Sequence, residues 1–384
     1  MKIGIITIHN SPSYGGSLQS YALYRYLELQ GYNVEIIDLH RPYQRDYQVS
    51  RVYKVYSEKS LFQSLLLSLK KSVKGILEKR TATESLYSEK AFEKFQSFNG
   101  MIKYSEPYLG CDMLYRNPPI YDVYITGSDQ VWNPYQPYCI EPYFLTFVPK
   151  GKKRVSYAAS VGLDKLPIVF EDKVSKWLKN YNYISVREQK TANYLSALTG
   201  LNIATVADPT FLLTPEYWNK IAVRPKSKNY ILMFTLGTNS KVLEYCRSLS
   251  SESGLDLISL RMKQPEYAES MGYYAVTDAG PAEFLGYLAN ADLVITDSFH
   301  GTVFSFLMGA KNVFTYISDS NKRGVRIINL YDEMGCSDHI LHGELQDTYL
   351  ELQNKSLNKE QINKNIDRIA SASRQFLLNS LSNE

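Results

Sequence analysis

Residues 292–304 read DLVITDSFHGTVF, a pattern typical of a buried strand, a tight turn and the start of a helix. The apolar, β-branched run at 293–295 predicts a parallel strand covered on both faces, and the polar residues after it supply turn and cap chemistry. Ligands of open α/β sheets bind beyond the carboxyl ends of strands, where a helix start attracts anions. His300 lies at this start and can exchange a proton near neutral pH. It either belongs to a site or caps and packs under the helix.

Length and composition predict a soluble globular chain. Its 384 residues exceed one typical core, so two domains are expected. Hydrophobic residues make up 44% and charged residues 21%, and no apolar run is long enough to span a membrane. The net charge of +4 is too small to indicate nucleic acid as a partner. The four cysteines form no CxxC pair and the chain opens without a signal-peptide pattern, so a cytoplasmic location is expected.

The first 38 residues predict a strand, a helix and a second strand. This βαβ opening indicates a parallel sheet whose loops gather at one edge. The loop between strand and helix, HNSPSYGGS at 9–17, lacks GxGxxG, so a dinucleotide is not indicated. It forms either a ligand contact or a plain turn capped at Ser17. Its candidate ligand residues are His9, Asn10, Tyr14, Gly15 and Gly16.

Two later loops also follow predicted strands. The loop GSDQVWNP at 127–134 combines hydrogen-bonding side chains with a tryptophan that we expect to be exposed, which suits a sugar. Its candidate residues are Asp129, Gln130 and Trp132. Arg187 follows the strand at 183–186 and can form a fork onto a carboxylate or phosphate. The alternative is a surface pair of Arg187 with Glu188 and no ligand.

A basic helical insertion is expected at 51–98. Eight lysines and arginines between 51 and 80 accompany only two glutamates, and apolar residues recur on one helical face. The segment is either a surface helix packed on the sheet or an amphipathic helix on an anionic membrane. The domain boundaries that we expect are 1–213 with this insertion, 214–343, and C-terminal helices at 344–384 that pack back on the first domain.

Several stretches of the chain form an ordered set of motifs. They are HNSPSYGGSLQSYAL, YDVYITGSDQVWNP, SYAASVG, ISVREQKTANYL, VADPT and ADLVITDSFHGTVFSFLMG. In this order and spacing, from about residue 3 to 330, they resemble the polysaccharide pyruvyl transferase family of bacteria. The resemblance implies a GT-B-like α/β fold, with two facing Rossmann-like domains that contain parallel sheets. It also implies transfer of the pyruvyl group of phosphoenolpyruvate onto a sugar as a ketal, with release of phosphate.

The resemblance assigns roles to single residues. Arg187 matches a donor-binding arginine, and His300 matches the histidine that is proposed as the proton donor. Relatives carry Arg-Leu-His-Gly where this chain has Ser298-Phe299-His300-Gly301, so a second donor arginine is missing. Arg323 or Arg326 is expected to replace its charge. The expected catalytic residues are His300 with Asp129, Asp297 or His9 as the base, and the expected donor-binding residues are Arg187, Ser298, Phe299, Gly301, Arg323 and Arg326. The expected acceptor-binding residues are His9, Asn10, Tyr14, Gln130 and Trp132.

We therefore expect a pyruvyl transferase for a bacterial capsular polysaccharide or exopolysaccharide. Its acceptor is the sugar chain or a lipid-linked oligosaccharide precursor, at the inner face of the cytoplasmic membrane. Phosphoenolpyruvate is the co-substrate, and no cofactor or metal is expected. Two alternatives stay open: a nucleotide-sugar glycosyltransferase of the same fold, and a non-catalytic glycan-binding member that has lost the donor site. Ser298 in place of arginine favours the second alternative.

Overall fold

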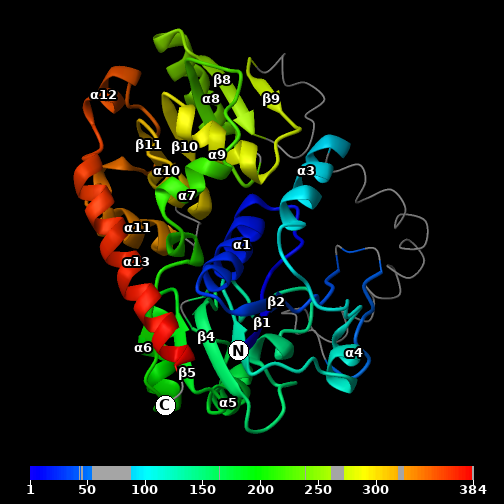
Figure 1. The fold of residues 1–384 in the computed structure, drawn as a ribbon. Helices are drawn as coiled ribbons and strands as arrows, with labels where there is room; N and C mark the ends of the chain where they lie inside the picture. The colour runs from blue at the N-terminus through cyan, green and yellow to red at the C-terminus, as the bar shows by residue number, and fades with distance from the viewer. Residues whose placement is uncertain are drawn as a thin grey trace, which may run out of the picture.

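The computed structural model describes residues 1–42, 44, 46–53, 88–163, 165–237, 239–260, 272–318 and 324–382. In this part of the chain the strands form two sheets of six, and the strand pairings are all parallel. Figure 1 shows the two sheets one above the other, with helices packed around each. The parallel α/β architecture expected from the sequence is confirmed.

The first sheet opens with the expected βαβ unit. β1 (Lys2–Ile6) leads into α1 (Tyr14–Leu29) and pairs in parallel with β2 (Asn33–Ile36). The helix is capped by Ser13 rather than by Ser17, so its first turn includes two glycines. The unit continues with α3 (Glu89–Asn99), α4 (Cys111–Arg116), β3 (Val123–Thr126), the 3₁₀ helix η1 (Glu141–Phe144), β4 (Lys153–Ala159), α5 (Ile168–Leu178), β5 (Tyr183–Val186), α6 (Gln189–Thr199) and β6 (Ala204–Thr205). The strand order is β2-β1-β3-β4-β5-β6.

The second sheet is centred on the strand of the 292–304 stretch. This strand, β10 (Leu293–Thr296), is buried along its whole length, as expected for a strand with neighbours on both sides. The other elements are η2 (Pro209–Leu212), α7 (Pro215–Ile221), β7 (Tyr230–Phe234), α8 (Ser240–Ser253), β8 (Asp256–Leu260), β9 (Tyr274–Val276), α9 (Pro281–Asn290), α10 (Phe299–Leu307), β11 (Val313–Tyr316), α11 (Gly324–Met334), η4 (Ser337–His339) and β12 (Ile340–Leu341). The strand order is β12-β11-β10-β7-β8-β9.

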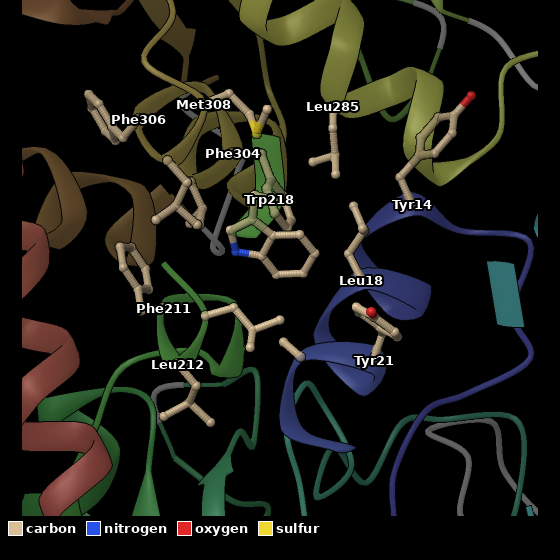
Figure 2. Close-up of a cluster of buried hydrophobic side chains, with 14 of the residues drawn as sticks. Tyr14, Leu18, Tyr21, Phe211, Leu212, Trp218, Leu285, Phe304, Phe306 and Met308 are labelled. Atoms are coloured by element: carbon tan, nitrogen blue, oxygen red, sulfur yellow. The ribbon is translucent and has the colours of Figure 1, made fainter. Parts of the chain in front are cut away.

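A hydrophobic cluster joins the two α/β units (Figure 2). Trp218 is fully buried, with its ring 6.2 Å from Tyr21 of α1 and 5.0 Å from Phe304 of α10, measured between centroids. Tyr14 of α1 stacks on Phe284 of α9 at 4.5 Å and donates a hydrogen bond to the Ala279 carbonyl at 3.0 Å. This packing brings α1 against α10, and Gly15 in the first turn of α1 lies next to His300 in the first turn of α10.

The two C-terminal helices, α12 (Tyr349–Asn354) and α13 (Lys359–Leu381), lie against different units. α12 packs on α8 of the second unit. α13 returns to the first unit, where the Ser373 hydroxyl accepts a hydrogen bond from the Ala207 amide at 2.9 Å. Arg374 also donates from Nε to the Leu212 carbonyl at 3.1 Å. The long helix therefore ties both sheets to the segment between them (Figure 1).

Of the basic stretch 51–80, residues 54–80 lie outside the described residues. Among the residues that are described, no helix combines the length and the apolar character needed to cross a membrane.

Candidate functional site

Polar side chains from both units meet where the strands of the two sheets end. Asp129 follows β3, Arg187 follows β5, Asp208 follows β6, and His300 lies in the first turn of α10, just after β10. The carboxyl ends of parallel strands gather at one edge of a sheet, so residues far apart in sequence become neighbours there. We call Asp129, Arg187, Glu188, Asp208, Phe299, His300 and Arg326 the edge cluster.

Arg187 is the centre of the edge cluster and is almost fully buried, with 4% of its side chain exposed. Its Nη1 lies 2.7 Å from Asp208 Oδ2, its Nη2 3.5 Å from Asp129 Oδ1, and its Nε 3.5 Å from Glu188 Oε1. Burial alone would lower the pKa of Arg187, but these carboxylates outweigh it and raise the pKa. The guanidinium is therefore held as a cation in one orientation.

Asp208 links Arg187 to His300. Its side chain is fully buried, and Oδ1 accepts hydrogen bonds from the Thr210 amide and hydroxyl at 3.1 and 3.0 Å. Oδ2 lies 3.5 Å from His300 Nε2, which is long for a hydrogen bond and makes the contact an ion pair when the imidazole is protonated. Burial would raise the pKa of Asp208, but His300 and Arg187 keep it well below its usual range. The carboxyl group is thus ionised at neutral pH.

His300 is fixed by both helices that meet at the edge cluster. Ser298 caps α10, because its hydroxyl accepts a hydrogen bond from the Gly301 amide at 3.2 Å, as the turn pattern predicted. Across the interface, a Cβ added to Gly15 of α1 would lie only 2.2 Å from His300 Nδ1. A Cβ on Gly301 would lie 2.6 Å from Thr296 Oγ1. Both glycines are therefore required by close contacts within the protein.

Two arginines lie over the ring of Phe299. The Cζ atoms of Arg187 and Arg326 lie 5.0 and 5.3 Å from the ring centroid, within cation–π range. Burial would raise the pKa of Asp129, but Arg187, His300 and Arg326 together lower it. Arg326, from α11, thus belongs to the edge cluster, whereas Arg323 lies outside the described residues.

The expectation that Trp132 is exposed is wrong. Its side chain is fully buried, stacks on Phe144 with centroids 4.9 Å apart, and donates from Nε1 to the Tyr143 carbonyl at 2.8 Å. Gln130 is also buried, and its Oε1 accepts a hydrogen bond from Asn133 at 3.0 Å. The loop after β3 folds these two side chains into the core of the first unit, so neither presents a surface to a sugar.

The structure places three of the residues proposed from the first loop in different surroundings. His9 is fully buried, with Nε2 2.9 Å from Asp38 and Nδ1 3.0 Å from the Thr7 carbonyl, and burial lowers its pKa. Asn10 turns the chain with a left-handed φ of 47°, and Tyr14 is committed to the contact between the two units. The side chains of His9 and Tyr14 are thus committed to contacts within the protein, whereas Asn10 is half-buried.

Asp297 lies at the end of β10 but points to a neighbouring loop. Its Oδ1 accepts a hydrogen bond from the Leu236 amide at 2.8 Å. Burial raises the pKa of Asp297, and this hydrogen bond opposes the shift only partly. Of the three proposed bases, Asp129 alone lies within the edge cluster.

Sequence reasoning missed Asp208 as a site residue. The available signal was its position in the stretch VADPT, just after β6 and at the same sheet edge as Arg187. Glu188 was noted only as a surface partner of Arg187, yet its Oε1 accepts a hydrogen bond from Ser160 at 2.7 Å inside the site. In the described part of the chain, no group of three or more His, Cys, Asp or Glu residues is arranged to hold a metal ion.

Solved structures with the same overall fold share little sequence with this chain. MnaA of S. aureus, solved with UDP, has a TM-score of 0.51 and 11% identity over 100% of this chain and 98% of that chain. A glycosyltransferase involved in avilamycin A biosynthesis has a TM-score of 0.50 and 11% identity, with 99% and 97% covered. A putative UDP-N-acetylglucosamine 2-epimerase from Listeria monocytogenes has a TM-score of 0.50 and 12% identity, with 98% and 95% covered. These likenesses confirm the GT-B-like fold and no more than the fold.

Family membership comes from the sequence. A search of curated proteins finds no match. The family model described as polysaccharide pyruvyl transferase matches residues 14–320, which include every member of the edge cluster except Arg326. The match covers most of the chain, and the chain therefore belongs to the polysaccharide pyruvyl transferase family.

Proposed function

We propose that this protein transfers the pyruvyl group of phosphoenolpyruvate onto two hydroxyls of a sugar, forming a cyclic ketal and releasing phosphate. The observation that carries the proposal is the position of His300 beside two arginines that share the ring of Phe299. A donor with a carboxylate and a phosphate requires fixed cations next to a proton source. The edge cluster offers this combination at the edge of the sheets where ligands of this architecture bind.

The reaction that we propose balances in two steps. Protonated His300 gives a proton to the methylene carbon of the donor, and the oxygen of one sugar hydroxyl bonds to the adjacent carbon while its proton passes to a base. Asp129 is the preferred base, because it lies in the edge cluster and its lowered pKa keeps it ionised. The second hydroxyl oxygen then bonds to the same carbon, the bond to the phosphate oxygen breaks, and its proton leaves with the phosphate. A positioned acid contributes about 10²–10⁴-fold in rate.

We further propose that Arg326 replaces the charge of the arginine that is missing at position 298. The hydroxyl of Ser298 already caps α10, and Arg326 reaches the ring of Phe299 from α11. Arg187 holds Asp208 at 2.7 Å but Asp129 and Glu188 only at 3.5 Å. An incoming anion therefore competes with the two longer contacts and leaves the contact with Asp208 in place.

The acceptor that we propose is a sugar of a bacterial surface polysaccharide or of its lipid-linked precursor. Family membership supports a polysaccharide acceptor in general. The excess of basic residues at 51–80 supports contact with an anionic membrane surface, where a lipid-linked acceptor resides.

The test incubates the protein with phosphoenolpyruvate and a library of lipid-linked glycans, and measures phosphate release and glycan mass. The expected product gains the mass of one pyruvic acid minus one water, and His300→Ala slows this gain by roughly 10²-fold or more. Thermal-shift measurements with phosphoenolpyruvate and a panel of nucleotide sugars accompany the assay. Stabilisation by a nucleotide sugar with glycosyl transfer would establish the glycosyltransferase alternative. Glycan binding without phosphate release for any acceptor would establish the non-catalytic alternative.

A further inference from the structure

We infer that Asp208 is a positioning residue that holds His300 with Nε2 turned inward, so that Nδ1 is the nitrogen that gives the proton. This inference rests on the proposed function, because it assigns the geometry of the proposed acid. The Asp208 carboxylate would then position two groups, because its Oδ2 lies 2.7 Å from Arg187 and 3.5 Å from His300. The acid and the donor-binding cation are thereby set relative to each other.

The two nitrogens of His300 lie in different surroundings. Nε2 is buried without a hydrogen-bond partner and faces Asp208 Oδ2. The imidazole side chain as a whole is 14% exposed, and because Nε2 is buried this exposure lies on other atoms of the ring. Nδ1 packs against Gly15 of α1. If His300 is the acid, the buried Nε2 is shielded from the donor, and Nδ1 is left as the nitrogen that gives the proton.

Asp208 is itself held in one orientation. Thr210 donates both its amide and its hydroxyl to Oδ1. Oδ2 faces Arg187 at 2.7 Å, and His300 and the Ser128 hydroxyl at 3.5 Å each. Asp208 follows β6 of the first sheet, whereas His300 follows β10 of the second. The carboxylate therefore joins the acid of one unit to the cation of the other, and the correct placement of His300 depends on the packing of the two units.

A carboxylate behind an imidazole fixes the ring and stabilises its protonated form. In the proposed transfer, the proton on Nδ1 moves to the methylene carbon, and the proton on Nε2 stays beside Asp208. Asp208 remains ionised throughout and accepts no proton. The histidine then returns to the protonated form by taking one proton from solvent at Nδ1.

The first test needs no substrate. Nitrogen-15 spectra of the histidine rings, recorded for the wild type, Asp208→Asn and Glu188→Gln, report the buried Nε2 proton of His300, which His300→Gln identifies by its loss. Glu188→Gln is the matched control. Glu188 also pairs with Arg187, but this pair is formed with Arg187 Nε and does not involve His300. We expect a slowly exchanging Nε2 proton in the wild type and in Glu188→Gln, and its loss in Asp208→Asn. An unchanged signal in Asp208→Asn, or a proton on Nδ1 alone in the neutral wild type, overturns the inference.

The second test uses the pH profile of pyruvyl transfer. Removing the carboxylate makes the protonated imidazole less favourable, so in Asp208→Asn the alkaline limb of kcat moves to lower pH. We also expect kcat to fall by about 10-fold or more, whereas Glu188→Gln keeps the limb in place. A limb that stays in place in Asp208→Asn contradicts the inference.

A third variant covers the case in which Asp208→Asn does not fold. Thr210→Val keeps the charge and removes one hydrogen bond to Oδ1. We expect faster exchange of the His300 Nε2 proton in this variant, and unchanged exchange overturns the inference. If the spectra agree with expectation but no acceptor is pyruvylated, the proposed function fails while the placement of His300 by Asp208 stands.

Discussion

Replacing Gly15 by alanine tests whether the position of His300 limits the reaction. The added Cβ would lie 2.2 Å from Nδ1, whereas ordinary contacts begin at 3.4 Å, so the imidazole has to move by about 1.2 Å. A misplacement of about 1 Å at a reacting group costs on the order of 10²-fold in rate. We therefore expect Gly15→Ala to lower kcat by about 10²-fold while the KM for phosphoenolpyruvate changes only a few-fold.

Gly16→Ala is the matched control, because both glycines lie in the first turn of α1. A Cβ on Gly16 would meet Ser11 Cβ at 3.4 Å, an ordinary contact. Alanine in place of glycine stabilises a helix by up to about 1 kcal/mol, and both variants share this gain. In Gly15→Ala the clash offsets it at a typical cost of about 1–3 kcal/mol. We expect Gly16→Ala to keep wild-type kcat and to unfold at an equal or higher temperature.

The assay is phosphate release at saturating phosphoenolpyruvate, together with thermal unfolding of both variants. Equal kcat for Gly15→Ala and Gly16→Ala would refute the reasoning, because the imidazole would then tolerate the displacement. Equal loss of activity in the two variants would refute it as well, since the effect would come from the helix and not from the contact with His300.

Four further predictions concern other side chains. Arg187→Ala raises the KM for phosphoenolpyruvate with little change in kcat. His300→Ala lowers kcat by roughly 10²-fold or more and leaves donor binding within a few-fold. Titration calorimetry measures the donor binding, and steady-state kinetics measure KM and kcat. Arg326→Ala also raises this KM, Arg326→Lys restores part of the affinity, and wild-type donor kinetics in both variants would exclude the replacement of the missing arginine. Because the pKa of Asp297 is raised in the folded state, its ionisation opposes folding as pH rises through the folded-state pKa. We therefore expect Asp297→Asn to be at least as stable as the wild type at pH 7, and to show no gain in the free energy of unfolding near pH 3. Urea unfolding at the two pH values measures this difference. Exchanging Lys70, Lys71 and Lys74 within the 51–80 stretch for Glu should reduce co-sedimentation with anionic vesicles, each lysine being worth about 1 kcal/mol near the surface, and unchanged binding would argue against a membrane role.

Local patterns determined the elements and several of the site positions. The strand at 293–295, the turn and the helix after it follow from apolar periodicity and cap residues, which act over a few neighbouring residues. The same local reasoning placed Arg187 at the carboxyl end of its strand, and the βαβ opening required the parallel sheet. These features depend on backbone preferences and on the pattern of apolar residues, both of which can be read from neighbouring residues in the sequence.

Tertiary structure alone decided which side chains face one another. Trp132 follows a strand in a loop rich in hydrogen-bonding residues, yet it is buried because the loop folds back onto Phe144. The contact of Asp208 with His300, and that of Gly15 with the same imidazole, join residues of the two units. No local pattern contains these contacts, because the direction of each side chain is fixed by the packing of α1 against α9 and α10 and not by its own neighbours in sequence.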